Sequence, residues 1–159
     1  MSFKIIEANE SHISFIYDFI QKIALYEKLS HEVEITKEQL DFHLIHNKSA
    51  HCILGFENEE PVGFALYFFN FSNFKGKQGL YLEDLYIDEA HRGKGYGKKL
   101  LLALVKIAEE KQCGRMEWSV LNWNKPAIEF YESLGAVPMN EWTVYRLNEE
   151  KIKRITKNF

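Results

Sequence analysis

The sequence predicts one α/β domain with a central mixed, mostly antiparallel sheet flanked by helices. Segments with the two-residue alternation of strands occur between segments with the 3.6-residue spacing of helices. No linker, repeat or low-complexity segment divides the 159 residues, a length typical of a single domain. The composition, 46% hydrophobic and 27% charged, is that of a globular chain with a sizeable core.

The first half of the chain predicts two helices and three strands. They are expected at residues 3–8 (strand), 13–25 (helix), 36–44 (helix), 51–56 (strand) and 61–71 (strand). Asn9 or Ser11 can cap the first helix, and TKEQ at residues 36–39 has the form of a capping box that begins the second. The polar residues 57–60 predict a turn that joins two of the strands.

The second half predicts strands that alternate with helices. They are expected at residues 80–87 (strand), 95–112 (helix), 116–120 (strand), 126–134 (helix) and 136–147 (one or two strands). Pro126 suits a first helical turn, and Gly114 and Gly135 are expected to end the two helices. The basic residues 151–157 predict a solvated helix end or tail.

Charge and hydropathy argue against several classes of protein. The net charge of −3 and the lack of a polybasic block argue against a nucleic-acid partner. The sequence contains no run of about 18 apolar residues, so no membrane span is expected, and no apolar leader follows Met1. Reduced thiols at Cys52 and Cys113 and a cytoplasmic location are therefore expected.

The loop after the strand at residues 80–87 reads RGKGYG at residues 92–97. A P-loop fails twice, because Arg92 stands where its first glycine belongs and Lys99 where serine or threonine belongs. A dinucleotide fingerprint fails because it needs glycine at Lys98 or Leu100. A tight turn needs one glycine, whereas three glycines with adjacent cations fit a phosphate held by backbone N–H groups at a helix start. Arg92 and Lys98 or Lys99 would add charge-assisted hydrogen bonds.

Three separated segments resemble the GNAT N-acetyltransferases. The R-x-x-G-x-G at residues 92–97 is similar to their acetyl-CoA signature, and YLEDLYI (81–87) and VLNWNKPAIEFYESLGA (120–136) resemble the spermidine/spermine and thialysine branch. ALYEKLSHEV (24–33) is more similar to the thialysine members. The resemblance implies a single GNAT domain over residues 1–159, acetyl-CoA as co-substrate, and a homodimer formed by the last strands and the aromatic-rich third strand.

The resemblance also implies which residues bind acetyl-CoA. The loop N–H groups would bind the pyrophosphate, the strand at residues 85–87 would run beside the pantetheine arm, and Asn124 would meet the cofactor from the fifth-strand side. The expected contacts are Leu85, Tyr86, Ile87, Arg92, Gly93, Lys94, Gly95, Tyr96, Gly97, Lys98, Asn124 and Tyr131.

Amine acetylation requires a base, because an amine of pKa near 10.4 is neutral in only about one part in a few thousand at pH 7. Glu83 and Asp84 lie side by side in an apolar strand and are expected on opposite faces. A lone strand acid is more often a solvated edge charge, but the resemblance at YLED implies Glu83 as a water-mediated base. Asp84 would attract the cationic substrate. A shift of one residue in register would exchange the two, so the choice stays open.

The leaving thiolate requires a proton donor. By residue type alone, an aromatic residue at helical spacing such as Tyr131 is more often part of the core, although Phe130 beside it could fill that core position instead. The family pattern N-x-x-x-x-x-F-Y-x-x-x-G matches Asn124, Phe130, Tyr131 and Gly135. This resemblance implies that Tyr131 is the general acid.

For the acceptor, the resemblance implies that Tyr26 and Glu27 bind substrate together with Glu83 and Asp84. The polyamine members carry an acid and a tryptophan within the segment that here reads NFSNFKGK (70–77), with neither residue. Its two lysines, expected near the site mouth, would suit an amine that also carries a carboxylate. A thialysine- or lysine-like acceptor is therefore favoured over spermine.

These features predict transfer of an acetyl group from acetyl-CoA to a small primary amine, directly in a ternary complex. No serine or cysteine stands in a nucleophile arrangement, and His43 and His46 lack a third ligand, so no metal is expected. Three alternatives stay open: a GNAT acting on a protein or peptide amine, a non-catalytic acyl-CoA-binding module, and a structural domain whose loop binds nothing.

Overall fold

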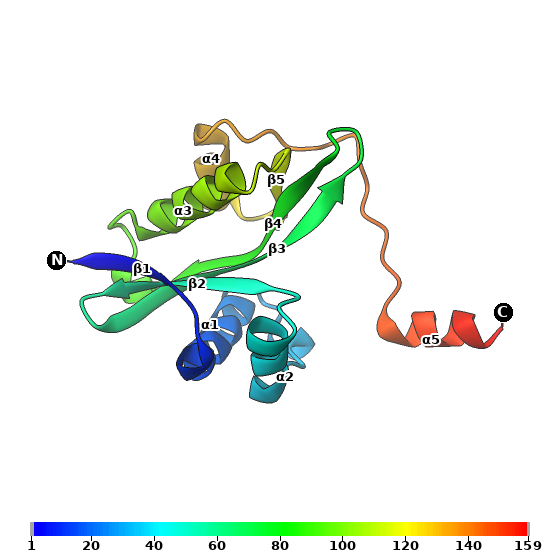
Figure 1. Cartoon of the computed structure of the whole chain (residues 1–159), viewed down its shortest axis with the longest axis horizontal. Coiled ribbons are helices and arrows are strands. Elements are labelled where there is room, and N and C mark those ends of the chain that lie inside the picture. Colours follow the sequence, from blue (N-terminus) through cyan, green and yellow to red (C-terminus); the bar gives the residue numbers. More distant parts are fainter. Residues whose placement is uncertain (1, 159) are drawn as a thin grey trace. The chain divides into compact units, whose positions relative to one another are not determined.

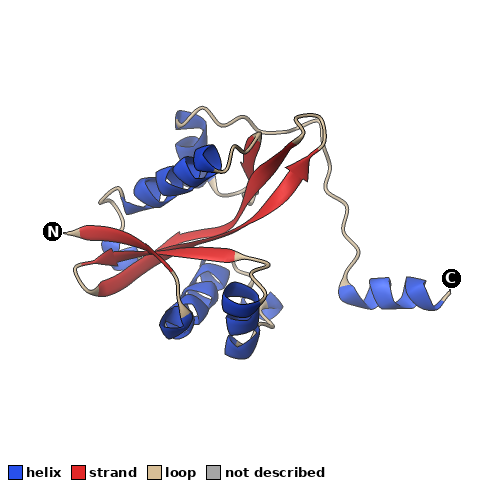
Figure 2. Ribbon diagram, viewed as in Figure 1, coloured by secondary structure: helices blue, strands red, loops and turns tan. Residues whose placement is uncertain are grey.

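A computed structural model describes residues 2–158 of the chain. The chain divides into two compact units, the first ending at Leu121 and the second beginning at Asn122. The first unit contains a five-stranded sheet in the order β1-β2-β3-β4-β5 (Figures 1 and 2). The first three neighbouring pairs are antiparallel and β4–β5 is parallel, which confirms the predicted mixed, mostly antiparallel sheet.

The strands are β1 (Phe3–Glu7), β2 (His51–Glu57), β3 (Glu60–Ser72), β4 (Lys77–Ile87) and β5 (Arg115–Trp118). The α-helices are α1 (Ile13–Tyr26), α2 (Lys37–Asp41), α3 (Tyr96–Glu110), α4 (Lys125–Ser133) and α5 (Glu149–Lys157). Short helical turns are η1 (Glu10–His12), η2 (Ser30–Glu32), η3 (Phe42–His46, a π-helical turn) and η4 (Glu89–His91). The helices and strands predicted before residue 135 are all present, with ends that differ by a few residues.

Helices cover both faces of the sheet in the first unit. Helices α1 and α2 lie on one face and α3 on the other (Figure 1). On the α1 face, Ile16 and Phe19 pack with Leu54 and Phe64 of the sheet in one buried cluster. On the other face, three leucines of α3 are at most 1% exposed, namely Leu100, Leu101 and Leu104. The central strands are therefore buried on both faces, as the consecutive buried residues 52–55 of β2 and 62–65 of β3 show.

The predicted side-chain cap is present at the start of α2, whereas in the first helical region Asn9 caps the turn η1 and α1 begins after His12 without a side-chain cap. Thr36 Oγ1 accepts from Gln39 N at 3.1 Å, and Gln39 Oε1 accepts from Thr36 N at 2.9 Å, so the capping box is confirmed. Asn9 Oδ1 accepts from Ser11 N, and the turn η1 then leads into α1.

The end of α3 differs from the prediction. Gly114 was expected to be its glycine cap, but the helix ends at Glu110 and the left-handed residue is Gln112, with φ of 56°. Cys113 N donates to Ala108 O at 2.8 Å, which closes the last turn two residues earlier than expected. Gly114 serves a different need, because a Cβ there would lie 2.9 Å from Cβ of Lys75.

The second unit contains α4 and α5. Gly135, with φ of 90°, ends α4, and Ala136 N donates to Tyr131 O at 3.2 Å, which confirms the predicted glycine cap. The prediction of one or two strands at residues 136–147 is wrong, because this segment, which lies within the described residues, contains no strand. A strand requires a hydrogen-bonded neighbour. The described ladders involve only the five strands β1, β2, β3, β4 and β5. Residues 151–157 lie within the amphipathic helix α5.

Among the described residues, no helix combines the length and apolar character needed to cross a bilayer.

Candidate active site

The site begins where β4 continues beyond its parallel partner. The ladder between β4 and β5 joins Gly79–Leu82 to Arg115–Trp118, whereas β4 runs on to Ile87. From Glu83 onward, the described ladders pair β4 with β3 alone. A strand edge of this kind offers backbone N–H and C=O groups to an extended ligand. Three residues expected to bind the cofactor lie along this edge, Leu85, Tyr86 and Ile87.

A β-bulge lies at the first residue of this open edge. Leu66 of β3 pairs with Asp84 and Tyr67 pairs with Leu82, so Glu83 is the extra residue on β4. At a bulge, two residues of one strand oppose one residue of its neighbour, which interrupts the alternation of side chains. The bulge therefore interrupts the simple alternation on which the expected opposite facing of Glu83 and Asp84 was based, and that facing stays a prediction.

Three carboxyl groups act on one another at this bulge. Burial, and after it the charges of Glu83 and Glu27, together raise the pKa of Asp84 to about 7. The pKa of Glu27 is raised by its burial and then by the charge of Glu83. Glu83 itself is exposed. The structure thus brings together the three acids that the sequence analysis expected to bind substrate. Their cluster is a region of negative potential that would attract a cationic amine.

The end of α1 supplies Glu27 and Tyr26. Tyr26 is the last residue of α1 and is 42% exposed, and Glu27 caps the helix through its backbone N–H, which donates to Ile23 O at 2.9 Å. The guanidinium of Arg92 lies 5.3 Å from the ring centroids of both Tyr26 and Tyr86. Arg92 thus links an expected acceptor residue to the loop expected to bind acetyl-CoA.

The loop itself has the conformation that its glycines permit. Gly93 and Gly95 have φ of 83° and 81°, a region that side chains strain. Gly97 has no positive φ, and a Cβ there would make an ordinary contact of 3.7 Å with Ile87 Cγ1. Gly95 is the N-cap of α3 and has no side chain to cap it. The N–H groups of the first turn, as at every helix start, have no intrahelical acceptor, and here no cap side chain lies between them and a ligand, which suits the predicted binding of an anion.

The cations of the loop contact the protein itself. Arg92 Nε donates to Ile87 O at 2.9 Å. Lys94 Nζ donates to Glu57 Oε1 at 2.8 Å. Lys99 Nζ lies 5.6 Å from the ring centroid of Phe3, and Lys98 is exposed on the first turn of α3. Backbone N–H groups are therefore the main feature that the loop offers to a phosphate.

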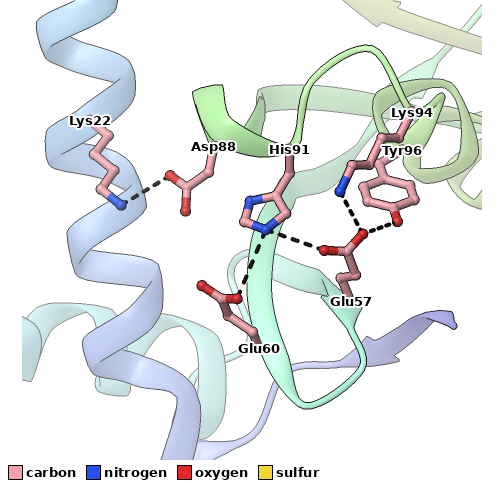
Figure 3. A network of polar contacts seen from close by, with 7 residues as sticks. All are labelled: Lys22, Glu57, Glu60, Asp88, His91, Lys94 and Tyr96. Atoms are coloured by element: carbon pink, nitrogen blue, oxygen red, sulfur yellow. Dashed lines mark hydrogen bonds and ion pairs between the residues drawn. The ribbon is translucent and has the colours of Figure 1, made fainter. Parts of the chain in front are cut away.

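Sequence reasoning missed Glu57, which it assigned to a polar turn. Its carboxylate lies at the end of β2 and is bound by the loop residues Lys94, Tyr96 and His91 (Figure 3). One signal could have identified it: in β2, Glu57 is in phase with the buried Ile53 and Gly55. A carboxylate in phase with buried residues requires partners.

Two expected site residues lie in the second unit. Asn124 is 8% exposed and caps α4, its Oδ1 accepting from Ala127 N at 3.4 Å. Tyr131 is half-buried in α4, with its ring centroid 5.6 Å from that of Phe130. The cap gives Asn124 a local structural role, and the cofactor contacts of both residues stay predictions.

The profile of the Acetyltransferase (GNAT) family matches residues 13–136, which include the open strand edge, the bulge and the glycine loop. This chain belongs to the GNAT acetyltransferase family. Members of the family use acetyl-CoA. The fold and the enzyme class that the loop and strand motifs predicted are therefore confirmed.

The names of three similar proteins refer to different amines. A thialysine N-epsilon-acetyltransferase from Bos taurus is 33% identical over 161 residues, covering 94% of each chain. An L-ornithine N5-acetyltransferase from Arabidopsis thaliana is 45% identical over 96 residues, which are 60% of this chain and 42% of the relative. A spermidine/spermine N(1)-acetyltransferase-like protein from Homo sapiens is 31% identical over 94% of this chain and 23% of its own length.

Solved structures show the same fold. An integron cassette protein from the mobile metagenome of V. cholerae has a TM-score of 0.80 at 27% identity, with 99% of each chain covered. A possible acetyltransferase from Clostridium difficile 630 has a TM-score of 0.78 at 19% identity, with 93% of this chain and 98% of that chain covered.

The β3–β4 hairpin of this acetyltransferase lies away from the acid cluster. Ser72 pairs with Lys77 at the tip end of the hairpin, and Lys77 is the first residue of β4. Asp84 lies seven positions along the strand from Lys77, a distance of roughly 23 Å. The expectation that Lys75 and Lys77 lie near the acceptor site is therefore wrong within the first unit.

Neither thiol of the acetyltransferase is activated as a nucleophile. Cys52 is 3% exposed and burial raises the pKa of its thiol, as it does more weakly for Cys113. Among residues 2–158, no group of three metal-ligating side chains converges.

Proposed function

We propose that this acetyltransferase transfers the acetyl group of acetyl-CoA to a primary amine of a small cationic acceptor. The observation that carries the proposal is the carboxyl cluster of Glu27, Glu83 and Asp84 at the bulge beside the open edge of β4. A protonated amine would be attracted to this cluster, next to the strand edge proposed for the acyl donor.

For acetyl-CoA, the proposed contacts follow the strand and the loop. The pantetheine arm would pair with the backbone of residues 85–87 as an added strand. The pyrophosphate would accept hydrogen bonds from N–H groups of residues 92–98, whose glycines allow close approach. Asn124 and Tyr131 of the second unit would contact the same co-substrate.

The proposed chemistry requires a proton to leave the amine and another to reach the thiolate. Glu83, exposed at the bulge, would accept the amine proton directly or through water. The neutral nitrogen then attacks the thioester carbonyl and forms the N–C bond, the C–S bond breaks, and the nitrogen releases its second proton to solvent. Tyr131 would protonate the departing thiolate and recover its proton from solvent. The raised pKa of both thiols supports direct transfer without a covalent enzyme intermediate.

Among acceptors, we propose an amino-acid-like amine, of the thialysine, lysine or ornithine type, with di- and polyamines as the alternative. Both the bovine thialysine enzyme and the human spermidine/spermine-like protein match 94% of this chain, but the match covers 94% of the first protein's length and 23% of the second's. Because the hairpin lysines lie far from Asp84, the preference depends on these relatives and on the acid cluster rather than on Lys75 and Lys77.

We further propose a homodimer, with residues 137–147 at its interface. Six apolar side chains of this segment are between 56% and 92% exposed: Val137, Met139, Trp142, Val144, Tyr145 and Leu147. Exposed apolar side chains at this density are typical of an interface. Sedimentation of the protein with and without Trp142→Glu tests this, and a wild-type monomer at assay concentration would contradict it.

The test of function is CoA release with a panel of acceptors: thialysine, lysine, ornithine, putrescine, spermidine, spermine and a lysine-containing peptide. The proposal predicts turnover on a small amine, highest on an amino-acid-like one. Higher turnover on the peptide would favour a protein-directed enzyme. Binding of acetyl-CoA without turnover would favour a non-catalytic module, and no rise in melting temperature with acetyl-CoA would contradict the site itself.

A further inference from the structure

The buried carboxylate of Glu57, at the end of β2, contacts three residues in and beside the glycine loop. Glu57 is 7% exposed. Its Oε1 accepts from Lys94 Nζ at 2.8 Å and from the Tyr96 hydroxyl at 2.5 Å, and its Oε2 lies 3.3 Å from His91 Nε2 (Figure 3). A carboxylate bound by three groups in a buried position is strongly localised.

The three partners enclose the two glycines that have positive φ. His91 precedes them in η4, Lys94 lies between Gly93 and Gly95, and Tyr96 is the first residue of α3. Glycine is the residue with the most conformational freedom to lose on ordering. Contacts on both sides of these glycines therefore restrict the part of the loop that is hardest to order.

Tyr96 is itself fixed by packing. Its ring stacks on Phe3 of β1 with centroids 4.0 Å apart and planes at 8°, and the residue is 6% exposed. The Tyr96 hydroxyl thus reaches Glu57 from a ring that cannot turn away, and the first turn of α3 is held by β1 and β2 together.

Lys94 is directed toward Glu57 rather than outward from the loop. Its side chain is 34% exposed, and its ammonium is paired with a carboxylate whose pKa is lowered by the hydrogen bonds from Lys94 and Tyr96. The carboxylate therefore remains charged and retains this partner at neutral pH.

We infer that Glu57 is a positioning residue of the acetyl-CoA site: through Lys94, Tyr96 and His91 it holds residues 91–97 in the conformation that presents the loop N–H groups to the pyrophosphate. This inference depends on the proposed function of the loop. A preformed loop lowers the ordering cost of binding, so Glu57 acts on the affinity for acetyl-CoA and not on the acetyl transfer itself.

The test compares Glu57→Ala with Glu57→Gln and with the matched control Glu59→Ala, which removes an exposed acid of the same turn. The dissociation constant of acetyl-CoA is measured by calorimetry, and kcat and KM by CoA release. We expect Glu57→Ala to weaken binding by about tenfold or more, with kcat at saturating acetyl-CoA within about threefold of wild type. Glu57→Gln, whose amide oxygen still accepts hydrogen bonds, loses less, and Glu59→Ala loses nothing.

A double-mutant cycle separates positioning from direct phosphate contact. If Lys94 acts through Glu57, the Glu57→Ala/Lys94→Met variant binds acetyl-CoA no more weakly than Glu57→Ala alone. Additive losses would mean that Lys94 contacts the phosphate itself, which overturns the role given to Glu57. Amide exchange should accelerate in residues 92–98 of Glu57→Ala while β2 and β3 keep their protection.

Wild-type affinity in a folded Glu57→Ala variant overturns the inference and leaves the proposed function intact. Absence of acetyl-CoA binding by the wild-type protein overturns the proposed function, and the inference with it. If Glu57→Ala does not fold, Tyr96→Phe and Lys94→Met test the same contacts singly. Each should weaken binding by roughly 3- to 10-fold, and wild-type affinity in both would overturn the inference.

Discussion

Two largely buried carboxyl groups in one sheet, Glu57 and Asp84, have opposite electrostatic surroundings. Glu57 accepts hydrogen bonds from Lys94 and Tyr96, which hold its pKa below the ordinary value. Asp84 lies beside Glu83 and Glu27, and its burial together with these negative charges raises its pKa to about 7. The first carboxyl is charged at neutral pH, whereas the second changes charge near neutral pH.

The difference shows that partners, rather than burial, separate an anchoring carboxylate from one suited to substrate. A carboxylate with its hydrogen bonds satisfied adds rigidity and has no capacity left for a ligand. A carboxyl that is surrounded by like charge gains when a cation arrives, because the cation favours its ionised form. In this acetyltransferase, the first arrangement supports the loop and the second belongs to the proposed acceptor site.

The largest expected effect is on kcat, and it distinguishes the roles proposed for Glu83 and Asp84. Glu83→Gln should lower kcat about 10²- to 10⁴-fold, as loss of a general base does, with the affinity for acetyl-CoA almost unchanged. Asp84→Asn should mainly raise KM for the amine. Steady-state kinetics of both variants check this, and a greater loss of kcat in Asp84→Asn would exchange the two roles.

A second effect concerns the proposed acid in α4. Tyr131→Phe should lose most turnover, about 10- to 100-fold, because the thiolate would leave without its proton donor. Acetyl-CoA affinity by calorimetry should change little. Phe130→Leu is the control for packing in the same helix, and wild-type turnover in Tyr131→Phe would end the assignment.

The stability of the protein should depend on pH through Asp84. Because its folded-state pKa of about 7 exceeds the ordinary value of 3.8 for an unfolded chain, the protonated form is favoured by folding. Stability is thus fully present below about pH 4 and falls as pH rises to 7 and beyond. Between pH 5 and pH 8 the loss should be roughly 2–3 kcal/mol in wild type and much smaller in Asp84→Asn. Urea unfolding at the two pH values measures it, and equal pH dependence in both proteins would contradict the burial of Asp84.

The smallest expected effect compares two glycines of the loop. Gly95→Ala should destabilise the protein by about 1–2 kcal/mol, because its φ of 81° strains a side chain. Gly97→Ala should cost under about 0.5 kcal/mol, since its Cβ finds ordinary contact with Ile87. Thermal unfolding of both variants tests this, and equal destabilisation would contradict the loop conformation.

Much of the fold could be predicted from the sequence, because alternation and capping are local. The capping box at Thr36 and the glycine cap at Gly135 depend on residues within one turn, and both are present. Gly114 misled because a left-handed residue can be Gln112 when the chain must turn earlier. The strands expected after Ala136 failed because a strand also needs a neighbour, which local pattern cannot supply.

The candidate site was predictable where it follows a contiguous motif and less so where it depends on tertiary contacts. The loop residues follow one another in the sequence, and so do the two acids Glu83 and Asp84. The bulge that changes their geometry depends on register with β3, and Glu57 reaches Tyr96 across 39 positions of chain. The hairpin lysines were misplaced because proximity in sequence to β4 says nothing about which end of the strand binds substrate.

The central claim is that the acid cluster receives a small cationic amine for acetylation by acetyl-CoA. The most direct measurement is kcat/KM for CoA release with thialysine, lysine, ornithine, spermidine and the lysine-containing peptide, in wild type and Asp84→Asn. The account predicts turnover on a small amine, highest on an amino-acid-like one, and a higher KM for that amine in the variant. Turnover confined to the peptide, or a KM for the amine that is unchanged by Asp84→Asn, would contradict it.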